Sequence, residues 1–336
     1  MKKGLVVLLV LVLLSGAVFA QGGSESKSGE KMKLMVYTSM KENLIGSIRD
    51  AFLAKYPDIE FDYYSAGAGK LMAKIATERQ AGNIACDVLW TSEVPDFIGL
   101  KREGVLLPYQ SPEKQGIVTT VDDKDGCFTA ARLGTLGICY NTEKIKNPPK
   151  TWEDLLKPEY KGNFSIANPA LSGTSMVSVA MIVETLGWDY IEALAKNGAR
   201  MGQGSGQVVD DTAAGDTYAA IGVDYITLDK ISKGANLGFV YLDKMLVVPS
   251  PVAIFKETKN EEAAKLFVDF LLSQEGQKCV ANAFTLPVRE DVEIRTDMGL
   301  VHPNEAKERA MTLDYEALSG NKAAYIEKFT TIIQGK

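Results

Sequence analysis

The sequence predicts an α/β protein in which two lobes are joined by a two-strand hinge and enclose a ligand cleft. Short apolar runs of strand character alternate with helical patterns, as at 33–37 followed by 42–52. Such alternation is typical of a mainly parallel sheet with helices on both faces. In addition, two long, apolar, extended segments at 127–141 and 245–255 are separated by a further α/β unit. These two segments are the expected hinge strands.

The hinge strands divide the chain into lobes. We expect residues 32–133 and 250–336 to form lobe 1 and residues 134–249 to form lobe 2. Roughly 300 residues remain after the N-terminal leader, which is enough for two domains of ordinary size. The cleft between the lobes is the expected ligand site.

The N-terminal leader is predicted to lie outside this fold. Two lysines precede an unbroken apolar run at 5–14 and small residues follow it, so residues 1–20 are typical of a secretory signal peptide. A lipoprotein-like signal is present in which Ala17 stands in place of the acceptor cysteine, so a membrane tether is expected only if the native signal carries that cysteine. Residues 21–31 are polar and are predicted to be a disordered tether. The protein is therefore expected to be exported to the periplasm.

Charge and cysteine content exclude some classes of protein. The formal net charge is −6 and no run of Lys or Arg occurs, so nucleic acid is not expected as a partner. The four cysteines allow three disulfide pairings in an exported protein, and none has the spacing of zinc ligands. We favour the pairing of Cys127 with Cys139, because they flank an expected hairpin at Leu133-Gly134, and the sequence does not determine the pairing of all four cysteines.

Small residues follow three successive predicted strands and are candidate ligand-binding residues. They are Thr38 and Ser39, then Ala68 and Gly69 within SAGAGK, and then Thr91 and Ser92. Because ligands bind at the carboxyl edge of an open α/β sheet, we expect these residues to share one site. Ser39 is also expected to form a capping box with Glu42 at the start of the next helix.

The stretch ANPALSGTSM at 167–176 is the strongest candidate for an anion site. It turns after a predicted strand and opens a helix with Ser172, Gly173 and Thr174 in the first turn. The first turn of a helix has unpaired backbone N–H groups and a partial positive charge, and a glycine there lets a ligand approach the backbone. Lys70 and Arg132 are candidates to add charge, although a solvated or ion-paired side chain is the alternative for each.

A second polar set lies in predicted lobe 2. It comprises Gln207, Asp210, Asp211 and Asp224. Carboxylates accept hydrogen bonds from hydroxyl groups, as sugar binding requires, and equally from ammonium groups. For Asp210 and Asp211, helix capping or exposure to solvent is an alternative of equal weight. Anion donors together with these acceptors favour a phosphorylated polyol such as a hexose phosphate, and an aminoalkylphosphonate would use the same groups.

Seven segments, in order along nearly all of the mature chain, carry a family resemblance. They are KLMVYTS at Lys33, SAGAGKLMAKIATER at Ser65, DVLW at Asp87, ARLGTLGICYNTEKI at Ala131, PKTWEDLLKPEYKGNFSIANP at Pro149, AAIGVDY at Ala219 and EEAAKLFVDFLLSQEGQ at Glu261. With these segments the chain resembles the bacterial extracellular solute-binding proteins of ABC transporters, in the branch that includes ferric-iron, phosphonate and sugar-phosphate binders. The resemblance implies a periplasmic binding protein-like fold whose two lobes close on a ligand and deliver it to an inner-membrane permease.

Iron is the alternative ligand within this branch. The resemblance implies that its ferric-iron binders use a tyrosine pair with histidine or carboxylate. Here the corresponding position reads Val223-Asp224-Tyr225-Ile226, with one tyrosine, and the only histidine, His302, lies outside every predicted cleft loop. No metal site is therefore predicted, although Tyr225, Asp224 and an external anion could together hold iron.

Catalysis is not expected. His302 has no Ser or Cys motif around it, and no P-loop, dinucleotide fingerprint or His-based metal motif occurs. We therefore expect a monomeric binding protein that is not an enzyme and has no cofactor, with a phosphorylated small molecule as its ligand.

Overall fold

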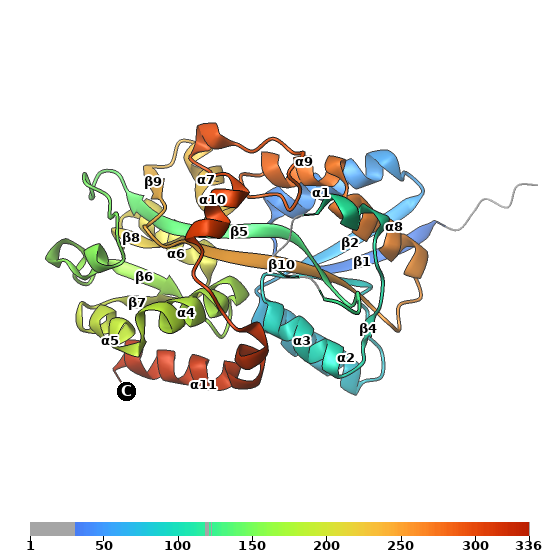
Figure 1. Ribbon diagram of the computed structural model, residues 1–336, viewed down its shortest axis with the longest axis horizontal. Helices are drawn as coiled ribbons and strands as arrows, with labels where there is room; N and C mark the ends of the chain where they lie inside the picture. Colours follow the sequence, from blue (N-terminus) through green and yellow to red (C-terminus); the bar gives the residue numbers. More distant parts are fainter. Residues whose placement is uncertain (1–30, 118–120, 122, 336) are drawn as a thin grey trace, which may run out of the picture. The chain divides into compact units, whose positions relative to one another are not determined.

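The central element of the fold is a sheet that the structure, a computed structural model, describes within residues 31–117, 121 and 123–335 (Figure 1). Its main path follows the order β2-β1-β3-β10-β5-β8-β6-β7, while β4 pairs with β10 and β9 pairs with β5. The strands are β1 Met32–Thr38, β2 Ile59–Ser65, β3 Val88–Trp90, β4 Leu106–Leu107, β5 Thr129–Asn141, β6 Phe164–Ala167, β7 Arg200–Gly202, β8 Ala219–Val223, β9 Leu237–Val240 and β10 Leu246–Phe255. The predicted signal peptide and the tether up to residue 30 lie outside the described residues.

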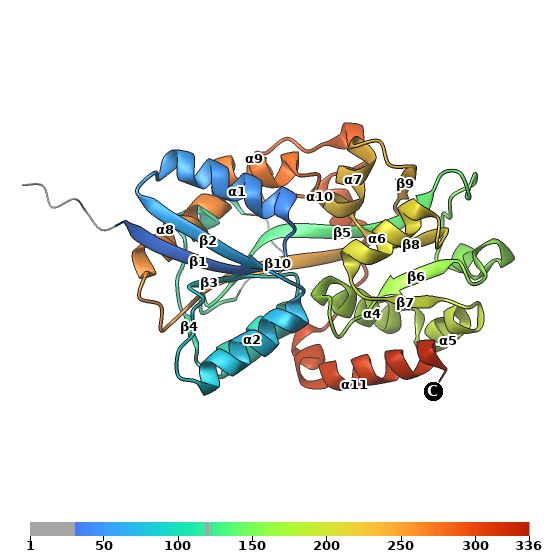
Figure 2. The same ribbon diagram turned by 180° about the vertical axis from the view of Figure 1, so that it is seen from behind.

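Helices cover both faces of the sheet, as the alternating pattern predicts. In Figures 1 and 2, α1, α8 and α9 lie on one side of the strands and α2, α3 and α4 on the other. The α-helices are α1 Glu42–Lys55, α2 Ala68–Gln80, α3 Val94–Arg102, α4 Gly173–Leu186, α5 Trp188–Lys196, α6 Ser205–Ala214, α7 Asp224–Ser232, α8 Glu261–Leu272, α9 Gln274–Asn282, α10 Pro303–Arg309 and α11 Tyr315–Gln334. Short 3₁₀ helices occupy Pro112–Gly116, Glu153–Leu156, Pro158–Tyr160 and Thr296–Met298. Within the described range, no helix is long and apolar enough to span a bilayer.

The sheet is parallel at its flanks and antiparallel at its centre. β1 pairs in parallel with β2 and β3, and β6 pairs in parallel with β7 and β8. The two long strands β5 and β10 pair antiparallel with each other, from Leu246 opposite Leu136 to Val252 opposite Thr129. β10 continues along β3, and β5 continues along β8. These two strands therefore join the two parallel flanks, as their extended apolar sequences predict.

The helix α1 shows how the apolar pattern is used. Leu44, Ile45, Ile48 and Phe52 recur at helical spacing, and all four are fully buried. Phe52 also stacks edge-on against Phe267 of α8, with 5.5 Å between the ring centres. This contact fixes α1 against the neighbouring helix on the same face of the sheet.

The predicted capping box at the start of α1 does not form. The N-cap residue is Lys41, and no side chain caps the helix. Ser39 instead accepts a hydrogen bond from the backbone N–H of Ser92, with 3.2 Å between the nitrogen and Oγ. The prediction failed because a contact with Ser92, which follows β3 and is 53 residues away, competes with the local cap.

The predicted disulfide between Cys127 and Cys139 is also wrong, because all four cysteines are free. The expected hairpin at Leu133-Gly134 is absent from the structure, since both residues lie inside the continuous strand β5. An extended strand advances about 3.3 Å per residue, so the two cysteines are roughly 30 Å or more apart. A disulfide needs Cα atoms within about 7 Å.

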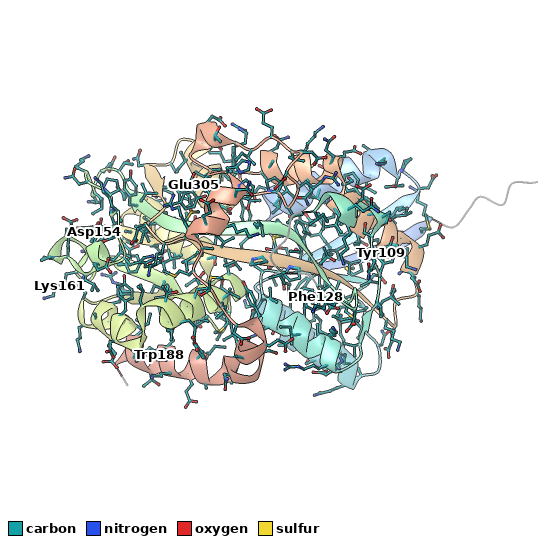
Figure 3. All side chains as sticks on the ribbon, viewed as in Figure 1. Tyr109, Phe128, Asp154, Lys161, Trp188 and Glu305 are labelled. Carbon is teal, nitrogen blue, oxygen red and sulfur yellow. The ribbon has the colours of Figure 1, made fainter. Side chains whose placement is uncertain are left out.

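The last helix, α11, contacts both flanks of the fold. It packs against α3 on one side and against α4 and α5 on the other (Figure 1). Trp188, labelled in Figure 3, lies at the start of α5 and contacts Tyr325 of α11, with 5.4 Å between the ring centres. The same indole ring lies 4.5 Å from the ammonium group of Lys328. α11 thus bridges elements that are far apart in the sequence.

Candidate functional site

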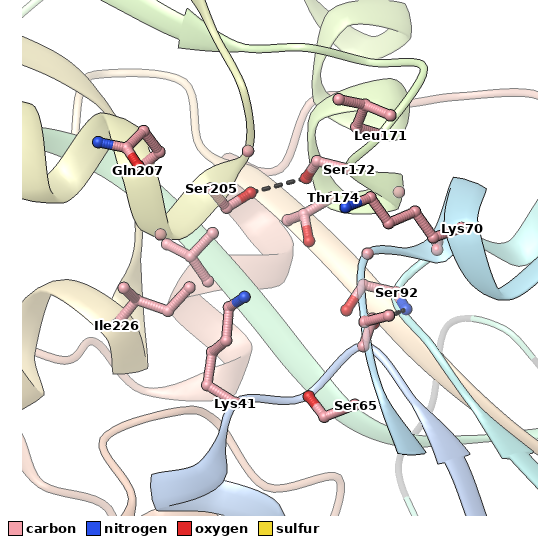
Figure 4. A pocket seen from close by; sticks show the side chains of 18 of the residues that line it. Lys41, Ser65, Lys70, Ser92, Leu171, Ser172, Thr174, Ser205, Gln207 and Ile226 are labelled. Atoms are coloured by element: carbon pink, nitrogen blue, oxygen red, sulfur yellow. Dashed lines mark hydrogen bonds between the residues drawn. The ribbon is translucent and has the colours of Figure 1, made fainter.

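A pocket of about 460 Å³ lies where the parallel strands of both flanks end (Figure 4). Residues directly after β1, β2 and β3 form one part of its wall, and loops after β6, β7 and β8 form the other. The volume is in the usual range for small-molecule sites. Its position at carboxyl strand ends is the one expected for ligand binding in an open α/β sheet.

Five α-helices begin at this pocket. Their N-cap residues all line it, and they are Lys41 for α1, Gly67 for α2, Ser172 for α4, Gly204 for α6 and Val223 for α7. The first turn of each helix has backbone N–H groups without an intrahelical partner and a partial positive charge. Such groups at one cavity favour an anionic ligand.

The charged side chains of the pocket wall have one sign. Lys41 and Lys70 extend into the pocket from different elements, and both ammonium groups point toward Thr174 (Figure 4). Among the described residues, the wall includes no Asp, Glu or His. The helix starts and the two lysines are all positively charged or partly so, and they therefore all favour a negatively charged ligand.

Hydroxyl groups connect the elements around the pocket. The Oγ atoms of Ser172 and Ser205 are 2.7 Å apart and share a hydrogen bond between the starts of α4 and α6 (Figure 4). Ser172 Oγ also accepts a bond from the backbone N–H of Ser175, at 3.3 Å. On the opposite wall, the Oγ atoms of Ser92 and Ser250 are 2.9 Å apart. These bonds orient the seryl groups that face the cavity.

Glycines allow the two parts of the wall to touch. A Cβ atom added to Gly67 would lie 2.2 Å from the carbonyl oxygen of Leu171, and one added to Gly69 would lie 2.1 Å from that of Ala170. The start of α2 therefore lies against the β6–α4 loop at a distance that only glycine permits. This contact closes one side of the pocket.

Directly beneath the pocket wall, Arg132 and Asp224 form a buried network. Asp224 is fully buried, and its carboxylate accepts bonds from the N–H and hydroxyl groups of Thr135 and from the hydroxyl group of Thr285, at 2.7 to 2.9 Å. Arg132 Nη1 lies 3.7 Å from Asp224 Oδ1, and the guanidinium lies 4.8 Å from the ring centre of Tyr225. Burial raises the pKa of Asp224, and the charge of Arg132 opposes that rise.

The structure brings together part of the predicted ligand-binding set. The predicted residues that line the pocket are Ser39, Ala68, Ser92, Ser172, Gly173, Thr174 and Gln207. Of the two basic candidates, Lys70 lines the pocket, whereas Arg132 has the ion-paired role that the sequence left as an alternative.

The other predicted residues lie off the pocket wall, and each has a protein environment of its own. Thr38 donates its hydroxyl hydrogen to the carbonyl oxygen of Trp90, and Thr91 is buried. Gly69 contacts Ala170 as described above. Asp210 pairs with Lys230 at 2.5 Å, Asp211 accepts a bond from Gln207 at 2.6 Å, and Asp224 is buried in the Arg132 network.

Several pocket residues were not selected from the sequence. They include Lys41, Tyr64, Ser65, Gln203, Ser205 and Tyr225. Ser205 carries a local signal, because it opens a helix after Gly202-Gln203-Gly204 much as Ser172 opens α4. Lys41 carries none, since a lysine before a helix occurs at many surface positions. The sequence indicated Tyr225 only as a metal-ligand candidate. In the structure, its hydroxyl group accepts a hydrogen bond from the backbone N–H of Lys41, at 3.0 Å.

The donor set of the pocket suits an anion better than a metal cation. Fe³⁺ is a hard cation that needs anionic oxygen ligands, and the lining side chains are hydroxyls, amides and lysines with Tyr64 and Tyr225. In the described part of the chain, no group of three or more His, Cys, Asp or Glu side chains could hold a metal ion. His302 lies at the start of α10, where its Nδ1 accepts a bond from the N–H of Asn304.

Known proteins with similar sequences include transport proteins. An "Uncharacterized protein" of Haemophilus influenzae is 30% identical over 83% of this chain and 83% of its own. The "Putative 2-aminoethylphosphonate-binding periplasmic protein" of Salmonella typhimurium is 26% identical over 72% of this chain and 73% of its own. Residues 94–321 match the model of a family described as bacterial extracellular solute-binding protein.

Solved structures with a similar fold include two with bound ligands. The periplasmic binding protein AfuA from Actinobacillus pleuropneumoniae, with exogenous fructose-6-phosphate bound, has a TM-score of 0.80 at 25% identity and covers 90% of this chain and 98% of its own. Iron-bound HitA from Pseudomonas aeruginosa has a TM-score of 0.75 at 24% identity and covers 90% and 99%. The fold is therefore the mixed α/β fold of periplasmic binding proteins, as predicted.

The chain belongs to the bacterial extracellular solute-binding proteins, because the matched region spans well over half of its length. It is thus a periplasmic or extracellular substrate-binding protein that binds a small solute and works with an ABC importer. Membership of this family also confirms the prediction that the protein is not an enzyme.

Proposed function

We propose that the pocket captures a phosphorylated small molecule, with sugar phosphates such as hexose phosphates as the favoured class, and that the protein delivers it to an inner-membrane ABC permease. The observation that supports this best is the pocket wall, where five helix starts and two lysines meet and where the described residues include no acidic side chain. A phosphate monoester carries a charge of about −1.5 to −2 at neutral pH. Lys41 and Lys70 match that charge.

The donors are sufficient for tight binding. Each hydrogen bond to a charged group contributes about 1.5 to 3 kcal/mol net. Micromolar affinity corresponds to about 8 kcal/mol. Backbone N–H groups at the start of α4, the hydroxyl groups of Ser172 and Thr174 and the two ammonium groups could together reach that value.

The remainder of the wall favours a polyol over an amine. Gln203, Gln207 and Ser39 can donate and accept hydrogen bonds with sugar hydroxyl groups. The ammonium group of an aminoalkylphosphonate would need a strong acceptor, and the wall offers only neutral oxygens in its described part. The fructose-6-phosphate bound to the similar AfuA supports the same choice.

Capture would involve closure of the two predicted lobes, 32–133 with 250–336 and 134–249, about β5 and β10. The pocket wall includes residues of both predicted lobes, Ser39 and Ala68 from 32–133 and Ser172 and Ser205 from 134–249. A ligand that contacts both sides stabilises the closed state. The chain would act as a monomer in this process.

The proposal can be tested by isothermal titration of the ligand-stripped mature protein. Glucose 6-phosphate and fructose 6-phosphate are compared with unphosphorylated glucose, 2-aminoethylphosphonate and ferric citrate. We expect micromolar or tighter binding of at least one sugar phosphate and no binding of glucose. Binding of 2-aminoethylphosphonate alone would make the amine the recognised group. Binding of ferric citrate alone would refute the proposal and return Tyr225 to the role of a metal ligand.

A further inference from the structure

Behind the start of α4, outside the pocket, lies a cluster of three charged residues, of which Glu93 is buried and Asp96 and Lys322 are partly buried. Glu93 directly follows the pocket residue Ser92 and is 1% exposed. Asp96 lies one turn further along, on α3. Lys322 of α11 pairs with both carboxylates, and its ammonium nitrogen is 2.6 Å from Asp96 Oδ1. The cluster therefore joins the β3–α3 connection to the C-terminal helix.

The cluster reaches the pocket through Gly173. A Cβ atom added to Gly173 would lie 2.6 Å from Glu93 Oε2 and 2.9 Å from the Cβ atom of Ala68. The Glu93 carboxyl group thus packs against the backbone of the first residue of α4, and Gly173 itself lines the pocket. Only that backbone separates an acidic group from the proposed anion site.

Negative charge at this position would repel an anion bound at the start of α4, and the repulsion would be strong because burial lowers the effective dielectric. Burial, helped by the charge of Asp96, raises the pKa of Glu93 to about 8, while Lys322 opposes that rise. Glu93 is therefore mostly protonated near pH 7, and Lys322 is the cation that pairs with Asp96.

We propose that Lys322 is a positioning residue for the ligand pocket: it holds Glu93 against Gly173 and cancels the acidic charge behind the start of α4, so that this helix start is available to an anion. The inference rests on the proposed function, because it concerns how the same pocket receives its ligand. Lys322 contacts no ligand and acts through Glu93 and Gly173.

The packing of α11 supports this role. Leu318, one turn before Lys322, forms a small buried cluster with Met176 and Ala180 of α4. Lys322 itself contacts α3. The same helix segment is therefore anchored to α4 and to the acidic pair, and it fixes the distance between them.

The first test compares two substitutions on α11. At pH 7, Lys322→Met should weaken the binding of glucose 6-phosphate by about threefold or more, because Asp96 loses its cation while Glu93 stays protonated. Lys328→Met is the matched control, since Lys328 lies over the ring of Trp188 and should leave affinity unchanged. Circular dichroism and thermal unfolding establish that both variants are folded.

The second test uses charge rescue and pH. The variant K322M/D96N should regain most of the affinity that K322M loses, because it removes the carboxylate that K322M leaves without a cation, and a merely structural role of Lys322 would not produce this rescue. In the wild-type protein, affinity should fall as pH rises from about 7 to 9 and Glu93 ionises, whereas Glu93→Gln should remove that fall. Among the described residues, the charged groups that act on Glu93 are Asp96 and Lys322, and Gly173 of α4 packs against its carboxyl group.

The outcomes separate this inference from the proposed function. Inorganic phosphate is titrated beside glucose 6-phosphate, so that the helix start is probed without a sugar. Wild-type protein that binds phosphate but no sugar phosphate would refute the proposed class of ligand and leave the cluster testable. Wild-type protein that binds neither would refute both. Lys322 has no positioning role if K322M binds the ligand as tightly as the wild type, or if E93Q still loses affinity as pH rises. If K322M does not fold, the pH dependence of ligand affinity in E93Q decides.

Discussion

The Arg132–Asp224 network, here called the lower centre, and the ligand pocket, here called the upper centre, are neighbouring polar clusters. They differ in whether their charged and hydrogen-bonding groups have partners within the protein. In the Arg132–Asp224 network, the carboxylate accepts bonds from Thr135 and Thr285 and has a guanidinium within 3.7 Å. In the pocket above it, helix starts and the ammonium groups of Lys41 and Lys70 face an open cavity. Both centres contain charges and hydroxyl groups. A charge that is already paired inside the protein maintains the fold, whereas donors that converge on a cavity indicate a ligand.

The largest expected effect comes from breaking the lower centre. Arg132→Met should reduce the free energy of unfolding by about 3 to 5 kcal/mol, because it leaves Asp224 buried without its cation. Urea unfolding followed by circular dichroism measures the change. Arg295→Met is the control, since Arg295 pairs with Asp297 at the surface and such pairs contribute little. An R132M protein as stable as the wild type but unable to bind ligand would place Arg132 in the upper centre instead.

An intermediate effect is expected from the upper centre, and it should appear in binding and not in stability. Lys41→Met and Lys70→Met should each weaken sugar-phosphate binding by about 1.5 to 3 kcal/mol, because each removes one charge-assisted donor. Titration calorimetry gives the affinity, and urea unfolding should be unchanged. Lys33→Met, at an exposed position of β1, is the control. Equal affinity in K41M, K70M and K33M would mean that the ligand does not reach these lysines.

The smallest expected effect concerns how the two parts of the pocket wall meet. Gly69→Ala places a Cβ atom 2.1 Å from the carbonyl oxygen of Ala170, so the start of α2 must move away and affinity should fall by roughly 1 kcal/mol or more. Gly99→Ala on α3 is the control, because nothing lies within 4 Å of its added Cβ atom. Alanine favours a helix over glycine in both variants, so stability alone would not distinguish them. If G69A binds the ligand with wild-type affinity, binding does not require the close contact between the start of α2 and Ala170.

The sequence predicted features that arise from local patterns. Apolar periodicity located α1 and the strands around it, and the Ser172–Thr174 helix start was recognisable because its donors come from the adjacent backbone. Ser39 and Ser92 followed from their positions at strand ends. The carboxyl ends of parallel strands lie at the same edge of a sheet, so these residues were expected to share one pocket.

Features that depend on distant partners could not be predicted in this way. Asp224 looked like a ligand acceptor, yet its partners Thr135 and Thr285 are 89 and 61 residues away in the sequence. Cys127 and Cys139 looked paired because the strand that separates them was read as a hairpin. Lys41 carried no pattern at all. In each case the deciding contact exists only once the chain has folded.

The described pocket wall has no acidic side chain, and this affects how the protein distinguishes the protonation states of a phosphate ligand. A carboxylate in a site can accept the proton of a partly protonated phosphoryl group, and this wall offers none. The second pKa of a phosphate monoester is about 6, so the ligand gains a proton and loses half of its charge in mildly acidic surroundings. If the ligand is the proposed sugar phosphate, such a wall would bind its fully ionised form more tightly than the protonated one. The acidity outside the cell would then set how much solute reaches the importer.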